Sequence, residues 1–324
     1  MMNMTEKMLE QIRDLFEKKN IKLFIGFEKG FEKFSRIPAF AENYDEAKSM
    51  IIDEFETPLL AKYLIRELGE VGAGAVEKSE RVGILTRGCD YLSIRRLVVD
   101  NIILRENLVI IGIPCNGLID PKKANKLLGE EAQEITVDEK IVLAKGEIKS
   151  REINKEEILL DRCKKCIMSK VEESDILLEE NMDDMEVSKD YSAVEEIEKL
   201  TTEERYEFWR RQFDRCIRCF ACRDACTACN CRKCIFDITE PEMLEKTVAT
   251  SEQFMFHFIR AFHVAGRCTA CGECEKVCPV DIPLGLLNGK FKKDIELLFD
   301  VDEAGIPAEI EPLGEFKLDD PVEW

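Results

Sequence analysis

The sequence predicts a chain of two different parts, an α/β domain with a partly parallel sheet followed by a mainly α-helical domain. A strand–helix–strand pattern lies in the first half, and eight regularly spaced cysteines lie between helical segments in the second half. At 324 residues the chain is long enough for two domains. We expect the α/β domain over residues 1–170, an acidic linker over 171–204, the helical domain over 205–295 and a C-terminal tail over 296–324.

The strand–helix–strand pattern occupies residues 83–117. Gly83 to Thr86 is short and apolar, Tyr91 to Val99 has helical periodicity, and Leu108 to Ile113 is a continuous apolar run. Continuous apolar runs are typical of parallel strands that are buried on both faces of a sheet. The pattern therefore predicts a βαβ unit with two parallel strands.

Four cysteines are placed so that they can converge at one edge of this sheet. Cys89 follows the first strand, and Cys115 follows the second. Loops after parallel strands emerge at the carboxyl edge, where ligands bind. Cys163 and Cys166 form a C-x-x-C pair after a helical stretch. The count and the topology predict a 4Fe-4S cluster held by these four thiolates, with buried structural cysteines or a thiol redox pair as the alternatives.

An acidic segment separates the two parts of the chain. From Glu172 to Glu204 it holds fourteen Asp and Glu residues against two lysines. Such a run is usually a solvated linker with some helix. The alternative is a docking surface for a basic partner subunit.

Eight cysteines form two runs with the same spacing, C-x2-C-x2-C-x3-C. The second run is followed directly by Pro279, which fixes its own φ and lacks a donor. This is the ligand pattern of a two-cluster ferredoxin, in which three thiolates of each run hold one 4Fe-4S cubane and the fourth crosses to the other. The predicted ligands are Cys216, Cys219, Cys222 and Cys226 in the first run and Cys268, Cys271, Cys274 and Cys278 in the second.

Zinc sites and disulfide frameworks are the alternatives for such runs. Zinc prefers two C-x-x-C pairs or mixed cysteine and histidine sets. Disulfides suit small secreted domains rather than a chain of 324 residues. Both alternatives are disfavoured, and the two runs predict electron transfer through iron–sulfur clusters.

Helical segments lead into both runs. Thr201 and Glu204 have the spacing of a capping box before the first run, and Thr250 and Gln253 have it before the second. The 41 residues between the two runs exceed what a compact ferredoxin needs, which favours an α-helical dicluster ferredoxin domain. The aromatic stripe on the second helix is expected in the core because of its helical spacing. It comprises Phe254, Phe258 and Phe262.

Three more cysteines make the first run less regular than the second. Thr227 also stands where a proline is expected after Cys226. The extra cysteines can exchange with Cys226 as the crossing ligand, hold another metal, or line the cluster as spare thiols, and the sequence leaves these alternatives open. They are Cys229, Cys231 and Cys234.

Basic residues gather around the first run in a chain whose net charge is −19. A cubane with four thiolates is a net anion, so nearby cations favour its reduced state. Exposed positions on a surface loop are the simpler explanation. The only histidines, His257 and His263, lie on the helix before the second run, where packing is more usual than metal binding. The five basic residues are Arg215, Arg218, Arg223, Arg232 and Lys233.

Charge and cysteine content also narrow the partners and the compartment. A net charge of −19 disfavours nucleic acid and anionic lipid as partners. No apolar run is long enough to span a bilayer, and Met1 to Arg13 lacks the apolar stretch of a secretory signal. Fifteen cysteines without an export signal predict a reducing cytoplasm, where thiolates stay available to iron.

The stretch from Arg81 to Asp120 contains Gly-Cys-Asp and Ile-Gly-Ile-Pro-Cys-Asn-Gly. It resembles the beta subunits of deazaflavin-reducing hydrogenases and dehydrogenases, including formate dehydrogenases. The resemblance covers roughly residues 80–170 and implies an α/β domain with a flavin and a 4Fe-4S cluster, here joined to a dicluster segment. No complete dinucleotide fingerprint accompanies it, because Gly72-Ala-Gly74 is only a lone G-x-G after a helical segment. FAD would be bound through loops at the carboxyl edge of the sheet.

Two functional classes follow from these observations. The first is an electron-transfer subunit of an anaerobic cytoplasmic oxidoreductase of the hydrogenase, formate dehydrogenase or heterodisulfide reductase type, with the chemistry on a partner in a hetero-oligomer. The second is a flavin-containing subunit that itself oxidises or reduces a deazaflavin or nicotinamide cofactor. A self-standing polyferredoxin is a weaker third. No constellation of catalytic residues stands out, so we predict the first class.

Overall fold

The computed structural model describes residues 3–18, 20–55, 58–69, 81–138, 141–166, 168, 171–178, 190–245, 247–299 and 313. The lone G-x-G at Gly72 to Gly74 lies outside these residues. The chain divides into two compact units. The first comprises Met1–Leu68, Val76–Tyr91 and Leu104–Lys189, and the second comprises Gly69–Ala75, Leu92–Ile103 and Asp190–Trp324.

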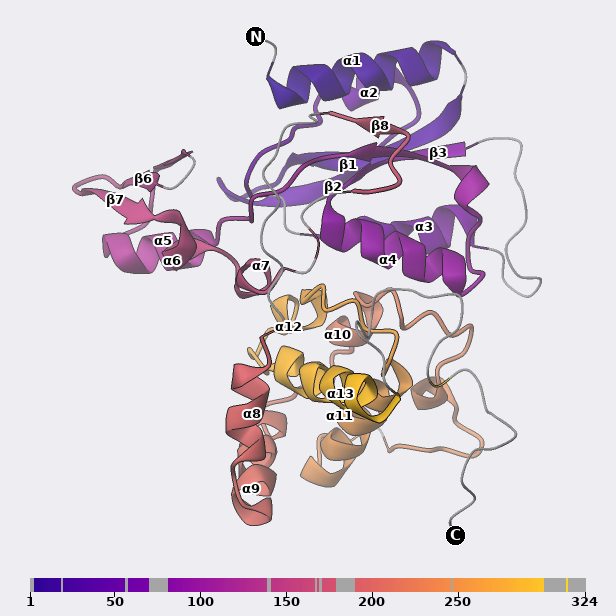
Figure 1. The fold of residues 1–324 in the computed structure, drawn as a ribbon, viewed down its shortest axis with the longest axis vertical. Helices are drawn as coiled ribbons and strands as arrows, with labels where there is room; N and C mark the ends of the chain where they lie inside the picture. The colour runs from indigo at the N-terminus through magenta and orange to yellow at the C-terminus, as the bar shows by residue number, and fades with distance from the viewer. Residues whose placement is uncertain are drawn as a thin grey trace. The chain divides into compact units, whose positions relative to one another are not determined.

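A five-stranded mixed sheet forms the centre of the first unit (Figure 1). Its strand order is β2-β1-β3-β4-β8. The pair β1–β2 is antiparallel, whereas β3 pairs in parallel with both β1 and β4, and β4 pairs in parallel with β8. A mainly parallel sheet confirms the predicted α/β fold class. The strands are β1 (Ile21–Lys29), β2 (Arg36–Ala41), β3 (Arg81–Thr86), β4 (Leu108–Gly112) and β8 (Ile176–Leu177).

The predicted βαβ unit is present. The strand β3 leads into α4 (Gly88–Val99), a short 3-10 turn at Arg105–Asn107 follows, and β4 then returns parallel to β3. The register runs from Val82 opposite Leu108 to Thr86 opposite Gly112. Every residue of β4 is buried, as expected for a strand covered on both faces.

Three further helices belong to the first unit, α1 (Met4–Glu17), α2 (Tyr44–Ala47) and α3 (Ala61–Leu68). Figure 1 shows α1 on one side of the sheet and α3 on the other. The start of α3 is held by Asp90, whose carboxylate accepts the backbone N–H of Leu60 at 2.8 Å and that of Ala61 at 2.9 Å. This buried carboxylate directly follows Cys89, so the cysteine loop and α3 are fixed to each other.

A small antiparallel sheet, β5-β6-β7, forms a separate core in the first unit. Leu118, Ile119 and Ile158 are among the apolar side chains buried there. The chain leaves this core through α7 (Asp161–Lys164), which carries Cys163. The other elements are α5 (Pro121–Leu128), β5 (Glu134–Val137), β6 (Ile141–Lys145), β7 (Ser150–Asn154) and α6 (Lys155–Ile158).

The described part of the second unit is helical. Its core brings Trp209, Phe213 and Phe256 together with two cysteines, Cys222 and Cys274. Thr201 and Glu204 form the predicted capping box at the start of α9. The helices are α8 (Ser192–Glu198), α9 (Thr202–Phe213), α10 (Ala221–Asp224), α11 (Thr250–His263), α12 (Glu273–Lys276) and α13 (Leu284–Phe299), with a 3-10 turn at Ile235–Asp237.

The predicted capping role of Thr250 is wrong. The helix α11 begins at Thr250 with Ala249 in the N-cap position and no side-chain cap. The Thr250 hydroxyl instead donates to Asp214 at 2.5 Å. Gln253 is fully buried, and its amide donates to the carbonyl of Cys216 at 2.9 Å. The local spacing was compatible with a cap, but tertiary contacts hold both side chains elsewhere.

The predicted burial of the aromatic stripe on α11 is also wrong for two of its three members. Phe258 and Phe262 are exposed, at 38% and 60%, whereas His257 and Arg260 on another face are almost completely buried. Polar side chains occupy this face because it contacts cysteine sulfur and backbone carbonyl groups that need donors. Helical spacing alone therefore identified the wrong face as the buried one.

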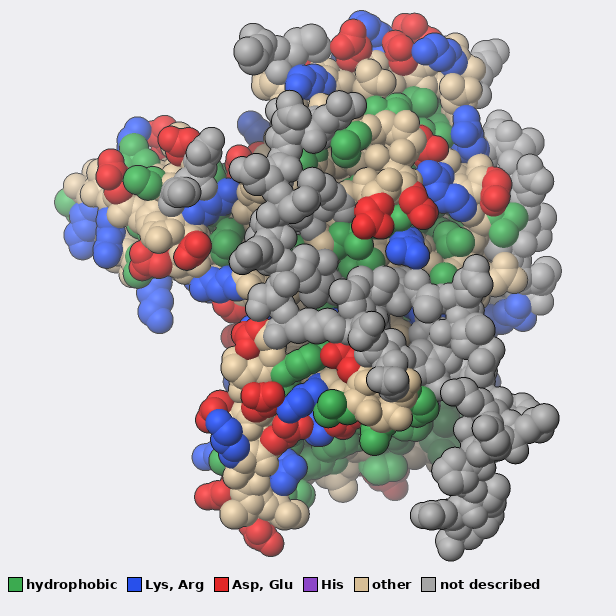
Figure 2. Space-filling model, in the orientation of Figure 1, with side chains coloured by type: hydrophobic (Ala, Val, Ile, Leu, Met, Phe, Trp, Pro, Cys, Tyr) green, Lys and Arg blue, Asp and Glu red, His purple; other side chains and the backbone are tan. Residues whose placement is uncertain are grey.

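Acidic and basic side chains alternate on the face seen in Figure 2. The described surface in that view has no single-sign field, although the whole chain has a net charge of −19. Among the described helices, none is both long enough and apolar enough to cross a membrane.

Replacing Asp90 with alanine should destabilise the first unit by about 2 kcal/mol, because two buried N–H groups at the start of α3 lose a charged acceptor. Urea unfolding followed by circular dichroism measures the change. Asp45→Ala serves as the control, since the Asp45 side chain is 85% exposed. Equal unfolding midpoints for the two variants would contradict this role of Asp90.

Candidate metal centres

The two predicted ligand runs adopt the same backbone conformation, shifted by 52 residues. In the first run Arg218 and Phe220 have φ values of 51° and 61°. The matching positions of the second run, Ala270 and Gly272, have φ values of 54° and 70°. A short helix then begins in each, α10 in the first and α12 in the second, and these two helices are in contact.

Left-handed backbone at Arg218, Phe220 and Ala270 is costly, because each of these residues has a Cβ. The penalty is about 1–2 kcal/mol per residue. Strained conformations of this kind persist where a function over-determines them, and they cluster at ligand sites. The same strained loop occurs in both runs, which indicates that the two loops have the same function. In each run this function is to place three cysteines around one ligand.

The first set of thiols combines three cysteines of the first run with the last cysteine of the second. Burial raises the pKa of Cys222 to about 11, and repulsion from negative charge at Cys216, Cys278 and Cys219 contributes. The pKa of Cys216 is raised in the same way, first by burial and then by Cys278 and Cys219. Cys278 thus lies with the first run, as expected for a crossing ligand.

The second set mirrors the first. Burial raises the pKa of Cys274 to about 12, and Cys226 and Cys268 add to the shift. The pKa of Cys271 is also raised by burial and by the charges of Cys226, Cys268 and Cys274. Cys226, the last cysteine of the first run, therefore lies among three cysteines of the second run.

Cys226 differs electrostatically from the other cysteines of its set. Its pKa is lowered, because a hydrogen bond with the thiol of Cys229 outweighs burial and Arg260 also stabilises the thiolate. Cys229 is thus the immediate neighbour of the crossing cysteine. Cys231 is exposed and Cys234 is half-buried. The alternatives for these three extra cysteines stay open.

None of the fifteen cysteines forms a disulfide. Within the described residues, no three His, Cys, Asp or Glu side chains lie close enough to hold a single metal ion. Binding iron would release the protons that burial keeps on these thiols.

Hydrogen-bond donors point at the sulfur atoms of both sets. The backbone N–H of Arg218 lies 3.4 Å from Cys216 Sγ, and that of Ile282 lies 3.4 Å from Cys278 Sγ. The side-chain amide of Asn288 lies 3.4 Å from Cys274 Sγ. Hydrogen bonds to sulfur are one of the means by which proteins set cluster potentials.

His257 is a donor to sulfur in this structure. Its Nε2 lies 3.3 Å from Cys216 Sγ, and its ring stacks on Phe213 at a centroid distance of 4.5 Å. Among the described residues Nδ1 has no hydrogen-bond partner, and in the tautomer with its proton on Nε2 the ring donates to Cys216 Sγ. Burial lowers the pKa of His257 to about 3, and Arg260 and Arg218 lower it further, so the ring is neutral. A neutral ring with Nε2–H donates to the Cys216 thiolate.

The cations predicted around the first run have other partners. Arg223 pairs with Asp224 at 2.8 Å and with Asp237 at 2.9 Å, and its guanidinium lies over the Phe220 ring. Arg218 donates to the Glu245 carbonyl at 2.6 Å. Arg215 bonds Gln212 and the Asp281 carbonyl, and Arg232 and Lys233 are exposed. The simpler explanation, an exposed loop, fits best for Arg232 and Lys233.

Arg260 is a buried cation of the second unit that sequence reasoning missed. It is 2% exposed, and its Nη2 donates to the carbonyl of Cys222 at 3.0 Å. Arg260 lies on a helix beside buried apolar residues such as Phe256 and Ala261. This pattern was the signal from which the burial of the arginine could have been predicted.

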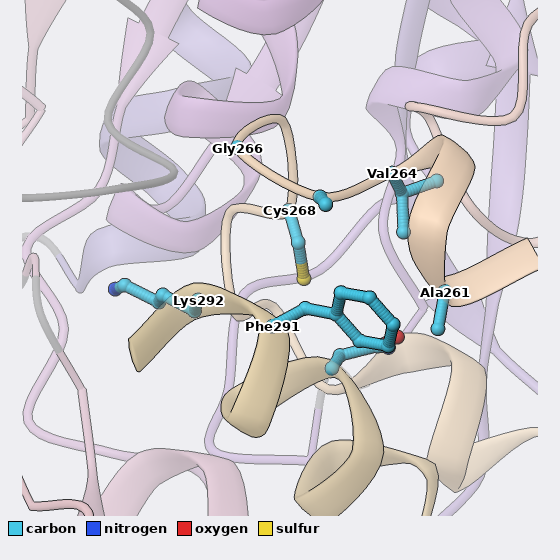
Figure 3. Close-up of a pocket in the computed structure, with 8 residues that line it drawn as sticks. Ala261, Val264, Gly266, Cys268, Phe291 and Lys292 are labelled. Atoms are coloured by element: carbon cyan, nitrogen blue, oxygen red, sulfur yellow. The ribbon is translucent and has the colours of Figure 1, made fainter. Parts of the chain in front are cut away.

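The side chains around Cys268 in the second unit pack closely and leave no space for a water molecule. Figure 3 shows the Cys268 side chain directed toward Phe291, with Gly266, Val264 and Ala261 around it. Gly266 has a φ of 73°, which lets the chain turn sharply between α11 and Cys268. The surroundings of this cysteine are therefore mainly apolar.

The four N-terminal cysteines also converge. Burial raises the pKa of Cys89 to about 12, with contributions from Cys115 and Cys163 that Arg162 partly offsets. The pKa of Cys166 is raised by burial and by the charges of Cys115 and Cys163. Cys89 in the first turn of α4 and Cys115 after β4 thus lie near the C-x-x-C pair, beyond the carboxyl ends of β3 and β4.

Local contacts hold the N-terminal loops together. The backbone N–H of Leu118 lies 3.4 Å from Cys163 Sγ, and the Cys166 thiol donates to the carbonyl of Met168 at 3.2 Å. A side chain at Gly88, next to Cys89, would collide with that same carbonyl oxygen. Glycine at this position permits the close approach of the Cys89 loop to Met168, two residues beyond Cys166.

Comparison with known proteins agrees with this geometry in the second unit. Residues 212–282 match the model of the 4Fe-4S dicluster domain. The match contains both cysteine runs, so iron–sulfur clusters and an electron-transfer role are confirmed as predicted.

Relatives and solved structures were also found. The F420-dependent formate dehydrogenase subunit beta of Methanocaldococcus jannaschii is 25% identical over 87% of this chain and 86% of its own length. The F420-dependent formate dehydrogenase 1 subunit beta of Methanococcus maripaludis is 25% identical over 44% of this chain and 34% of its own length. A chain in the structure of the F420-reducing [NiFe] hydrogenase complex of Methanosarcina barkeri matches with a TM-score of 0.38 and 12% sequence identity. The match covers 50% of this chain and 58% of the hydrogenase chain.

The first of these relatives extends the predicted resemblance from a short stretch to most of the chain. The chain is thus similar to F420-dependent formate dehydrogenase beta subunits over most of its length and carries a 4Fe-4S dicluster domain.

Proposed function

We propose that this chain is the iron–sulfur subunit of an anaerobic cytoplasmic oxidoreductase complex and passes single electrons between its partners through 4Fe-4S clusters. The observation that carries the proposal is the exchange of the last cysteine between the two runs. Cys278 lies with the first run and Cys226 with the second, which is the arrangement that two neighbouring cubanes require. Bond-breaking chemistry would take place on another subunit.

Each proposed cluster has four thiolates of its own. Three sets support three cubanes, two in the second unit and one in the first. The ligand sets are Cys216, Cys219, Cys222 and Cys278; Cys268, Cys271, Cys274 and Cys226; and Cys89, Cys115, Cys163 and Cys166.

The names of the relatives support an assembly of several subunits, because both are beta subunits of formate dehydrogenases. A hetero-oligomer with other oxidoreductase subunits is therefore proposed. The predicted complex is of the hydrogenase, formate dehydrogenase or heterodisulfide reductase type. The names of both relatives favour the formate dehydrogenase type. Neither nucleic acid nor a membrane is proposed as a partner.

The alternative is a flavin-containing subunit that itself oxidises or reduces a deazaflavin. The observation in its favour is the word "F420-dependent" in the names of both relatives. The carboxyl edge of the parallel sheet, where Cys89 and Cys115 lie, is also where such folds bind cofactors. FAD in a one-to-one ratio with the purified chain would favour this alternative, and its absence would favour a pure electron relay.

Chemical analysis of the anaerobically purified chain tests the cluster count. About twelve iron and twelve sulfide atoms per chain are expected, at four per cubane. Cys89→Ser should lower both numbers by about four, while Cys231→Ser, the same change at an exposed thiol outside the three sets, should not. Eight of each in the unmodified chain, or full iron in Cys89→Ser, would contradict a third cluster.

Replacing His257 with phenylalanine should lower the midpoint potential of one cluster only. The change removes the N–H near Cys216 Sγ, and that hydrogen bond favours the more negative, reduced state. Phenylalanine keeps the stacking on Phe213. Redox titration followed by electron paramagnetic resonance measures the potentials. Wild-type potentials in a variant with wild-type iron content would show that the histidine only fills space.

A further inference from the structure

Arg260 is an unusual residue for the interior of the second unit. Its side chain is among the largest that are fully buried, at 2% exposure. A buried cation is costly unless an anion and hydrogen-bond acceptors compensate for the lost water. One acceptor is the carbonyl of Cys222, which its Nη2 contacts at 3.0 Å. A neutral carbonyl does not balance the charge, so an anion is needed.

No carboxylate supplies that anion within the described residues, since none of the ion pairs there includes Arg260. The groups that would supply it are cysteine sulfurs, which become anionic when they are deprotonated. Burial opposes the charge of the guanidinium, but Cys274, Cys226, Cys222 and Cys229 hold the pKa of Arg260 above its ordinary value. Neighbouring arginines behave differently, because Arg223 and Arg267 pair with aspartates.

The sulfurs around Arg260 belong to both thiol sets. Cys222 is a member of the first set, and Cys274 and Cys226 are members of the second. Cys222 and Cys274 lie in one hydrophobic cluster together with Ala261, which directly follows Arg260 on α11. One guanidinium is therefore shared between two ligand sets.

We propose that Arg260 is a shared positioning residue that raises the reduction potentials of both clusters of the dicluster domain together. The proposal rests on the proposed function, since it requires that both sets hold cubanes. Each cluster takes up one electron on reduction, and no bond is made or broken. A cation near both sets stabilises that added charge in each cluster.

Arg260 and His257 act differently although they lie on the same helix. His257 contacts sulfur of the first set only, through Cys216. The Asn288 amide contacts sulfur of the second set only, through Cys274. Each of these donors would tune one cluster, whereas Arg260 would tune two.

The test is a redox titration of the anaerobically purified full chain with dithionite as the electron donor, followed by electron paramagnetic resonance. In Arg260→Met, both midpoint potentials should fall. The oxidised-to-reduced ratio of each cluster should shift by about tenfold at a fixed solution potential, which is about 59 mV for one electron. Arg210→Met is the matched control, because Arg210 is a partly exposed arginine that pairs with Glu207 and Asp214. Its potentials should equal those of the unmodified chain.

Wild-type iron content with two unchanged potentials in Arg260→Met would overturn the proposal, and so would a change in one potential alone. If Arg260→Met does not bind its clusters, the potentials of Arg260→Lys test the proposal instead. Lysine keeps the positive charge but places it at a different position. Both potentials should then shift in the same direction, and a shift of one or of neither contradicts the shared role. An unmodified chain that lacks both clusters would contradict the proposed function itself, whatever the variants show.

Discussion

The second unit depends on the burial of closely spaced cysteines in one apolar core. Cys222 and Cys274 lie in the same hydrophobic cluster as Trp209 and Phe256. Burial and mutual repulsion both raise thiol pKa values there, so the cysteines oppose release of their protons unless a cation joins them. The N–H groups aimed at sulfur and the buried Arg260 reduce that cost, and bound iron would remove most of it.

The first unit meets a similar requirement with a different architecture. Its cysteines follow two parallel strands and a short helix, rather than a tight run in one loop. Arg162 and the backbone N–H of Leu118 stabilise negative charge at Cys163, as donors and cations do in the second unit. Asp90 ties the Cys89 loop to α3. Both units thus surround buried cysteines with donors and with rigid backbone.

Cysteine spacing was enough to predict the dicluster domain, and strand patterning was enough to predict the parallel part of the sheet. The apolar run at residues 108–113 predicted a parallel strand, and its loop brought Cys115 to Cys89 and Cys163. The buried face of α11 could not be predicted in this way. Periodicity measures apolar character, whereas this face is selected by sulfur and carbonyl groups from segments distant in sequence. The buried face of α11 therefore carries His257 and Arg260, whereas the sequence predicted that the face with the phenylalanine stripe would be buried.

The central claim is that the two runs exchange their last cysteines, so that two cubanes lie next to each other in one core. The electron paramagnetic resonance spectrum of the fully reduced chain tests it most directly. Neighbouring reduced clusters interact magnetically, so a broadened spectrum is expected, and it should simplify in Cys278→Ser, which removes one ligand of the first set. Two sharp signals that add as isolated clusters, unchanged in that variant, would contradict the exchange.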